Sequence, residues 1–188
     1  PFGQSFLFEC RQRILGAGLE GRYFSDAGIG RLRRAQDGDE MSRKLEYLHP
    51  DLEPIARAFL AECERQGIEV LITCTYRSNT EQADTYAQGR TKPGRIVTWA
   101  KPGESLHNFI GPDGKPSSRA FDVVPLRNGK LIWGTSGDGI DDDPTDDQTD
   151  DLELWQRVGR IGELLGLSWA GRWQKPRTEY PHFQMKET

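Results

Sequence analysis

The chain has 188 residues, of which 35% are hydrophobic and 29% are charged, and its formal net charge is −4. This length suits a single domain with a genuine core, and no apolar run approaches the roughly 20 residues that span a bilayer. An acidic balance is also the wrong sign for a protein whose affinity depends on neutralising phosphates. We therefore exclude a transmembrane helix, disfavour a nucleic-acid partner, and expect a monomer that does not insert into membranes.

Residues 1–40 carry scattered Gly and Arg and little periodicity, whereas a well-patterned segment begins just after Met41. We predict that 1–40 is an extension outside the core and that 41–188 forms the core domain. The short apolar patch near the start follows no basic region, which argues against a secretory signal. The odd number of cysteines, without CxxC spacing, predicts reduced and packed thiols, with Cys63 and Cys74 on apolar positions of periodic segments.

Two segments show the spacing of amphipathic helices. In the first, apolar residues recur from Leu52 to Cys63, with Asp51 as the expected N-cap and Gly67 as the stop. The second segment follows an acidic stretch and also has one apolar face. The residues of that face are Leu152, Trp155, Val158, Ile161, Leu164 and Leu165. Both segments are predicted to pack on a common core.

Between these helices, the segment IEVLITCTYRS is rich in β-branched residues and predicts a strand that ends near Tyr76 and Arg77. Ser78 and Glu81 then form a capping-box pattern, which predicts a short helix that Gly89 ends. The predicted strand therefore delivers Arg77 to the mouth of a helix.

The rest of the chain predicts further short strands. In RAFDVVPLRNGKLIW two apolar runs are joined by Asn128-Gly129, the strongest short hairpin signal, and LSWAGRW and HFQM are typical of final strands. The acidic segment 138–151 lacks the glycine and the final glutamate of an EF-hand loop, so we predict a solvated loop. A few helices with several short, partly antiparallel strands predict an α+β domain.

Asp122 stands out because it interrupts an apolar run. An unpaired buried carboxylate is costly, so a cation should meet it. That cation could be an arginine such as Arg119, or it could be a metal ion. In the second case His107 and His182 are candidate partners, since imidazoles and a carboxylate form a recurrent ligand set for catalytic zinc, with a fourth position left to water or substrate. The residues alone leave both alternatives open.

A second acidic residue, Glu179, lies three residues before His182, with Pro181 between them. The proline predicts a turn that leads into a strand, unlike the helical HExxH arrangement. A carboxylate there could reach a water on a metal without binding the metal itself. The same side chain could also be a solvated loop residue.

Four segments taken together resemble the zinc-dependent peptidoglycan peptidases of the D-alanyl-D-alanine carboxypeptidase type. They are TYRSNTEQADTYAQGRTKPGRIVTWAKPGESLHN, RAFDVV, LSWAGRW and PHFQ, and they follow the family's order within residues 41–185. The likeness is greatest to the L-alanyl-D-glutamate peptidases used as phage endolysins. This resemblance implies an α+β fold with a small central antiparallel sheet and flanking helices, as in hedgehog and D-Ala-D-Ala peptidase domains, and a catalytic zinc peptidase domain over 41–188.

The resemblance also implies a role for each residue of the site. Glu179 would be the general base and acid, Arg77 would polarise the substrate carbonyl and help to hold the oxyanion, and Ser105 would support the site. The implied ligands of Zn²⁺ are His107, Asp122 and His182. The segment between the first two of these ligands is longer here than is usual in the family, which leaves the rim of the site and the fit of the substrate open.

The activity implied is hydrolysis of the L-Ala-D-Glu bond in peptidoglycan stem peptides, by an endolysin that stays in the host cytoplasm until lysis. One alternative is a D,D-carboxypeptidase or dipeptidase that acts on D-Ala-D-Ala. Another is a catalytically inactive, metal-stabilised wall-binding module, which the presence of both Glu179 and Arg77 speaks against. A His-metal nuclease, suggested by the tripeptide LHN, fits the acidic balance poorly.

Overall fold

The computed structural model describes residues 42–133 and 148–186. The helices and turns are η1 (Leu45–Tyr47), α2 (Glu53–Arg65), α3 (Asn79–Ala87), η2 (Leu106–Asn108), α4 (Gln148–Leu164) and η3 (Ala170–Arg172), and the strands are β1 (Glu69–Cys74), β2 (Ala120–Arg127), β3 (Lys130–Leu131), β4 (Leu167–Trp169) and β5 (His182–Met185). The predicted extension over 1–40 and residues 138–147 of the acidic segment lie outside the described residues. Residues 148–151 belong to α4 and Asp151 is buried, so the prediction of a solvated loop is wrong for this end of the segment. Among the helices of the described residues, none combines the length and apolar character needed to cross a membrane.

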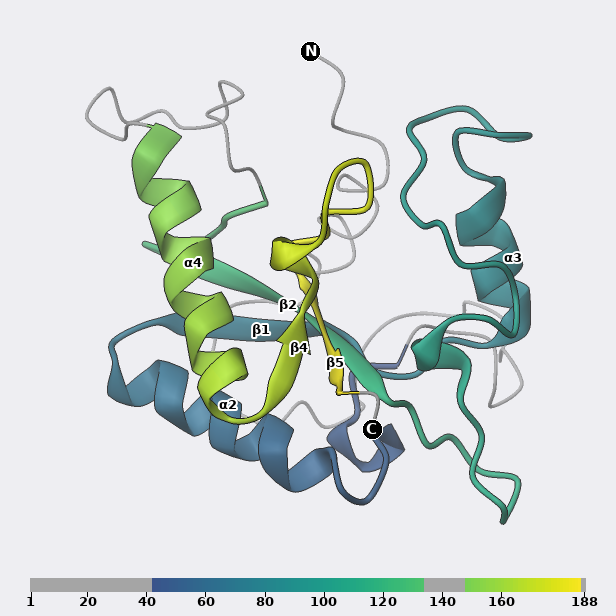
Figure 1. The fold of residues 1–188 in the computed structure, drawn as a ribbon, viewed down its shortest axis with the longest axis horizontal. Coiled ribbons are helices and arrows are strands. Elements are labelled where there is room, and N and C mark those ends of the chain that lie inside the picture. The colour runs from purple at the N-terminus through teal and green to yellow at the C-terminus, as the bar shows by residue number, and fades with distance from the viewer. Residues whose placement is uncertain (1–41, 134–147, 187–188) are drawn as a thin grey trace, which may run out of the picture.

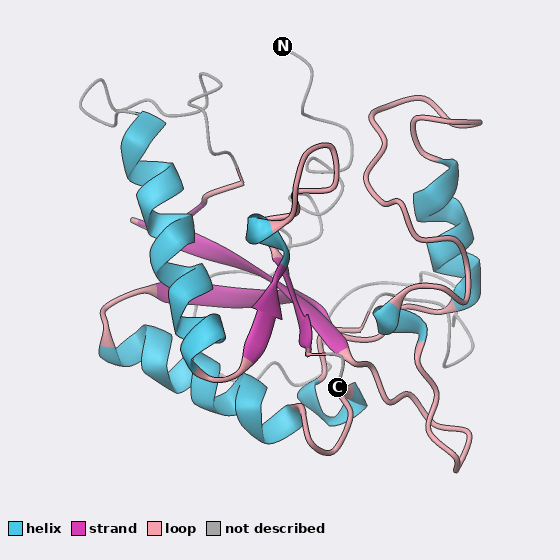
Figure 2. Cartoon of the chain, viewed as in Figure 1, coloured by secondary structure: helices cyan, strands magenta, loops and turns pink. Residues whose placement is uncertain are grey.

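The five strands form one antiparallel sheet in the order β1-β2-β5-β4, and β3 pairs with the end of β2. Asn128 and Gly129 join β2 to β3 with φ values of 51° and 74°, the positive values that a tight hairpin turn requires. Helices α2 and α4 pack together against the strands, and α3 lies apart from both, across the strands in the views of Figures 1 and 2. The predicted α+β fold with a central antiparallel sheet is confirmed.

The capping box of α3 is formed as predicted. The Ser78 Oγ accepts from the Glu81 N–H at 3.2 Å, and the Glu81 carboxylate accepts from the Ser78 N–H at 2.8 Å. The prediction of Asp51 as the N-cap of α2 is wrong, because Leu52 holds that position without a side-chain hydrogen bond. A proline in the first turn of α2 makes such a start tolerable, since its missing N–H would have no partner there in any case.

The prediction for the apolar face of α4 is also wrong at one residue. Leu164 is 85% exposed, whereas Trp155, Val158 and Ile161 are buried. Leu165 packs against the core instead, because it lies four residues after Ile161 and so returns to the inward side of the helix.

The core lies between the sheet and the pair α2 and α4, and it is centred on aromatic rings. Phe59, Phe121, Trp155 and Phe183 are all fully buried, and the rings of Phe121 and Phe183 are stacked with centroids 5.6 Å apart. Helix α4 comes very close to β5 at Gly162, where a Cβ atom would collide with the Phe183 ring. The core thus fixes the position of β5, the strand that begins with His182.

We expect Gly162→Ala to destabilise the protein by about 1–3 kcal/mol, the usual range for an overpacked core. The added methyl group would push α4 away from the Phe183 ring. Urea unfolding followed by tryptophan fluorescence measures this. Arg160→Ala, on the exposed side of the same helix, should change the unfolding free energy by no more than about 0.5 kcal/mol. Equal unfolding midpoints for Gly162→Ala and the wild type would contradict the prediction.

Candidate metal centre

The register of the sheet gathers three chemically reactive side chains in one row. Phe121 packs in the core, and because neighbouring side chains alternate along a strand, Asp122 faces the opposite side of the sheet. Asp122 pairs with His182 on β5 and with Cys74 on β1. A register shift just before Cys74 brings this residue opposite Asp122.

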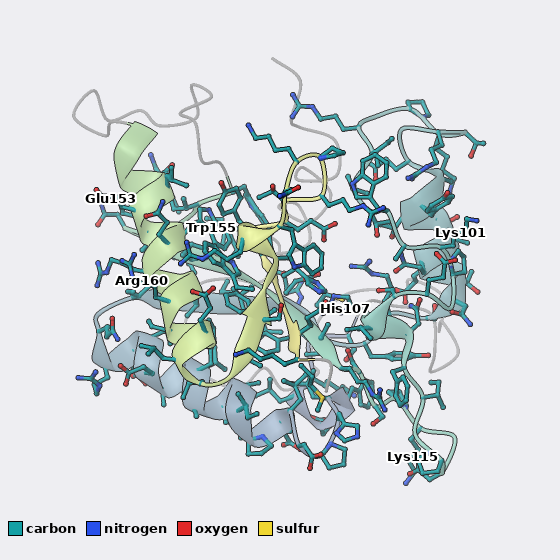
Figure 3. All side chains as sticks on the ribbon, in the orientation of Figure 1. Lys101, His107, Lys115, Glu153, Trp155 and Arg160 are labelled. Atoms are coloured by element: carbon teal, nitrogen blue, oxygen red, sulfur yellow. The ribbon has the colours of Figure 1, made fainter. Side chains whose placement is uncertain are left out.

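His107 reaches this row from the turn η2 and lies near the middle of the view in Figure 3. Ser105 caps the turn, and its Oγ accepts from the His107 N–H at 3.3 Å. The Nδ1 of His107 is 2.8 Å from the carbonyl oxygen of Thr75. Because a carbonyl oxygen can only accept, Nδ1 carries a proton and donates it. The other ring nitrogen, Nε2, is the one that faces Asp122.

Three atoms from the predicted ligands converge on one point. The His107 Nε2 is 3.3 Å from the Asp122 Oδ1 and 3.2 Å from the His182 Nδ1, and the last two atoms are 3.1 Å apart. The second ring nitrogen of His182, Nε2, is 3.0 Å from Oε1 of Gln184, to which it donates. Both nitrogens that face Asp122 are then left as acceptors. Three converging acceptors need a cation between them.

The spacing of these atoms can be compared with that of a real coordination shell. Ligand atoms about 2.0–2.1 Å from a tetrahedrally coordinated zinc ion lie about 3.3–3.4 Å from one another. The three distances of 3.1–3.3 Å are close to that value. The donor set and its spacing therefore fit a divalent ion such as zinc, and two further groups, the Thr75 carbonyl and Gln184, orient the imidazoles.

Electrostatics show the same demand for positive charge. Burial disfavours the charged form of His107, but Asp122 and Cys74 outweigh burial and raise the pKa of His107 to about 10. Burial also works to raise the pKa of Asp122, but His107 and His182 hold it well below its usual value. A proton on His107 thus supplies the positive charge that a metal ion bound at this position would supply in its place.

Cys74 offers an alternative third ligand. Ligand atoms of Cys74, His107 and Asp122 all lie within 4.8 Å of one another. However, the Cys74 Sγ is 3.7 Å from the His107 Nδ1, the nitrogen already bonded to the Thr75 carbonyl. We therefore favour His182, whose free nitrogen lies nearer. The predicted burial of Cys74 is confirmed, but sequence reasoning missed its place beside the site, because only the register shift in β1 puts it there.

Arg77, and not Arg119, is the arginine beside Asp122. The Arg77 side chain is 8% exposed, its Nη2 is 3.5 Å from the Asp122 Oδ2, and its Nη1 donates to the Oε1 of Gln82 at 3.0 Å. Arg119 instead lies over the ring of Phe109, 3.7 Å from the centroid. Gln82 is fully buried in α3 and was not predicted from the sequence. Its spacing of five residues from Arg77 gave no signal of its own.

Glu179 lies in the turn before β5, where its carbonyl accepts from the His182 N–H at 3.3 Å. Burial raises the pKa of Glu179 above its usual value, with Asp122 adding to the effect and the charges of His182, His107 and Arg77 opposing it. The carboxylate has no hydrogen-bond partner within the described part of the chain. A carboxylate with a raised pKa, beside a cation site, is suited to move a proton.

Comparison with known proteins gives three findings. A family model described as D-alanyl-D-alanine carboxypeptidase matches residues 116–185, a range that includes Asp122, Glu179 and His182. The chain is 37% identical over 139 residues to the peptidoglycan L-alanyl-D-glutamate endopeptidase CwlK of Bacillus subtilis strain 168, with 73% of each chain covered. Among solved structures, the L-Ala D-Glu endopeptidase ChiX of Serratia marcescens matches with a TM-score of 0.43 and 18% identity, covering 76% of this chain and 83% of ChiX.

Proposed function

The chain belongs to the D-alanyl-D-alanine carboxypeptidase family of peptidases, and we propose that it is a zinc peptidase that cleaves the L-Ala-D-Glu bond of peptidoglycan stem peptides. The observation that carries the proposal is the convergence of His107 Nε2, Asp122 Oδ1 and His182 Nδ1 beside Glu179. The choice of bond is supported by the identity of 37% to an endopeptidase named for that bond.

His107, Asp122 and His182 hold the ion in this proposal. A divalent ion bound there supplies Lewis acidity toward the scissile carbonyl and lowers the pKa of a water molecule to about 7. Glu179 accepts a proton from the attacking water at its carboxylate and delivers it to the leaving amine. The raised pKa of Glu179 suits this task, because a carboxylate whose pKa lies above its usual value takes up a proton more readily.

Two further residues complete the proposed site. Arg77 adds a second positive charge that stabilises the developing oxyanion, and its contacts with Asp122 and Gln82 fix its position before a substrate arrives. Ser105 is a positioning residue, since its Oγ holds the backbone N–H of His107. Residues 41–188 form the catalytic domain in this proposal, and 1–40 an extension to it.

Digestion of purified peptidoglycan followed by mass spectrometry tests the proposed bond. The expected products are muropeptides that keep only L-Ala on the muramic acid, together with peptides that begin with D-Glu. Release of free D-Ala would instead support the D,D-carboxypeptidase alternative. Intact stem peptides, with metal bound to the protein, would support an inactive wall-binding module.

The cell wall is the place of action that this substrate implies. For the biological setting we propose a phage endolysin that accumulates in the host cytoplasm until lysis, on the strength of the resemblance carried by the motifs around Arg77, His107 and His182. Expression in a bacterial host with and without a membrane-permeabilising partner tests this setting. Lysis only when the partner is present is the expected result.

We expect Gln184→Leu to weaken zinc binding by about 10- to 100-fold, the usual cost of losing a group that orients a metal ligand. Gln184 accepts the hydrogen bond from the His182 Nε2, so its loss frees the imidazole to rotate and to change tautomer. Competition with a fluorescent chelator measures the affinity without reference to activity.

Two variants accompany this measurement. Gln184→Glu keeps an acceptor in place and should retain wild-type affinity or better. Gln66→Leu, at the end of α2, removes a side-chain amide whose hydrogen bond within the described residues goes to Glu62, and it should have no effect. Equal zinc affinity in the Leu and Glu variants at position 184 would show that this hydrogen bond does not orient His182.

A further inference from the structure

Two loops that contact residues of the candidate metal centre also contact each other. One is the segment 88–104, between α3 and η2, and the other is the segment 173–181, between η3 and β5. The indole N–H of Trp99 in the first loop donates to the carbonyl of Pro176 in the second at 3.3 Å. The two loops therefore touch at this point.

Both loops are anchored in the site itself. In the first loop, the Ala100 carbonyl accepts from the Nε2 of Gln82, whose Oε1 accepts from Arg77. In the second loop, the ring of Trp173 lies 5.6 Å from the ring of His182, and Glu179 closes the segment. Both loops therefore lie next to residues of the candidate metal centre.

The loops carry cations that nothing in the described part of the chain neutralises. Arg95, Lys175 and Arg177 are exposed, and their side chains have no hydrogen bond or ion pair with any described residue. Some other cations of the two loops are held by hydrogen bonds. Arg90, for example, is held by the carbonyls of Tyr86 and Thr98.

Paired cations nearby give a direct contrast. Lys92 binds Asp84 at 2.8 Å, and Arg172 binds Glu163 at 3.1 Å. Lys101 is also exposed and has no side-chain partner among the described residues, but it lies beside α3, on the side of the first loop away from the second (Figure 3). The stretches 88–103 and 172–178 contain no acidic residue, although the whole chain has a net charge of −4.

We propose that Arg95, Lys175 and Arg177 form a rim that binds the carboxylates of the peptide substrate, in particular the free carboxylate of the D-glutamate whose amine is the leaving group. This inference rests on the proposed function. Trp99 and Ile96, about two-fifths exposed on the same loop, offer apolar contact to the peptide backbone beside the charges. Exposed cations that have no anionic partner raise the local concentration of an anionic ligand and orient it.

The test uses the triple variant Arg95→Gln, Lys175→Gln and Arg177→Gln, with a soluble stem peptide as substrate. Exposed charge pairs are individually weak, so three of them together should give a rise in KM of about 3- to 30-fold, with kcat little changed. The rise should shrink as salt is added, because exposed charges are screened. Arg160→Gln, which removes one positive charge on the exposed side of α4 (Figure 3), is the control and should leave KM unchanged.

A second substrate isolates the carboxylate. The same peptide with the D-glutamate carboxyl amidated should have a higher KM than the free acid with the wild type, and this difference should vanish in the triple variant. Arg95→Lys with Arg177→Lys keeps the charges and should behave as the wild type. If the triple variant distinguishes the free acid from the amide as well as the wild type does, the proposal that the rim binds this carboxylate is overturned.

The outcomes separate this inference from the proposed function. If the wild type cleaves neither peptide, the proposed function fails. Binding of the labelled acid and amide peptides, measured by fluorescence anisotropy, then still tests the rim. If the wild type cleaves both and the triple variant has an unchanged KM, only the rim fails. Loss of binding to whole walls rich in anionic glycopolymer, with unchanged KM on the isolated peptide, would also overturn it, because the cations would then serve a phosphate-bearing polymer.

Discussion

Glu179→Gln is expected to lower kcat for stem-peptide hydrolysis by about 10²- to 10⁴-fold, the range that general acid–base catalysis contributes. The amide has nearly the same shape as the carboxylate but cannot accept and return a proton. Because Glu179 is not among the three converging ligand atoms, zinc content should stay at the wild-type level. Steady-state kinetics on a synthetic stem peptide, with metal analysis of the same samples, measures both quantities.

Glu153→Gln is the matched control for this experiment, since it makes the same chemical change on the exposed side of α4 (Figure 3). It should leave both kcat and zinc content unchanged. A Glu179→Gln protein that keeps kcat within a few-fold of the wild type would remove Glu179 from the proposed proton transfer. Loss of zinc in that variant would instead indicate that Glu179 is a ligand.

His182→Ala is expected to weaken zinc binding by more than the roughly 100-fold that the loss of an orienting partner costs. Hydrolysis should fall by about 10³-fold or more, because the Lewis acidity lost with the ion contributes several kcal/mol to the barrier. Asp122 is less suitable for this test, since its removal would leave His107 and Arg77 as buried cations and would also destabilise the fold. Chelator competition and peptide kinetics measure the two effects.

Cys74→Ser is the counterpart of this variant, because Cys74 is the alternative third ligand. A serine hydroxyl is a poor substitute for a thiolate on zinc but a close match in size. If His182 is the ligand, Cys74→Ser should keep its zinc and most of its activity. The reverse pattern, with zinc lost in Cys74→Ser and kept in His182→Ala, would show that Cys74 is the third ligand beside His107 and Asp122.

Much of the fold could be predicted because local signals agree with the final packing. The capping box at Ser78 and Glu81 and the hairpin at Asn128-Gly129 are decided by a few neighbouring residues, and both are formed. The errors lie where tertiary contacts decide. The start of α2 needs no side-chain cap because the helix is held by its buried face, and Leu164 lies on the outward side of the last turn of α4.

The family and the peptidase class were predicted from the order of the motifs, and the comparisons confirm both. The motifs could not predict which side chains contact one another across the sheet. The pairing of Asp122 with Cys74 and His182 depends on strand register, and the roles of Gln82 and Gln184 depend on which atoms face Arg77 and His182. Neither glutamine has a sequence signal, because an amide that orients a ligand looks like any other polar residue.

X-ray absorption at the zinc edge of the zinc-loaded protein tests the central claim most directly, because it counts the atoms around the ion. We predict two imidazole nitrogens, from His107 and His182, together with one oxygen from Asp122 and one from water, all about 2.0–2.2 Å from the zinc. A sulfur scatterer at about 2.3 Å, or a shell with a single imidazole, would contradict this account of the site.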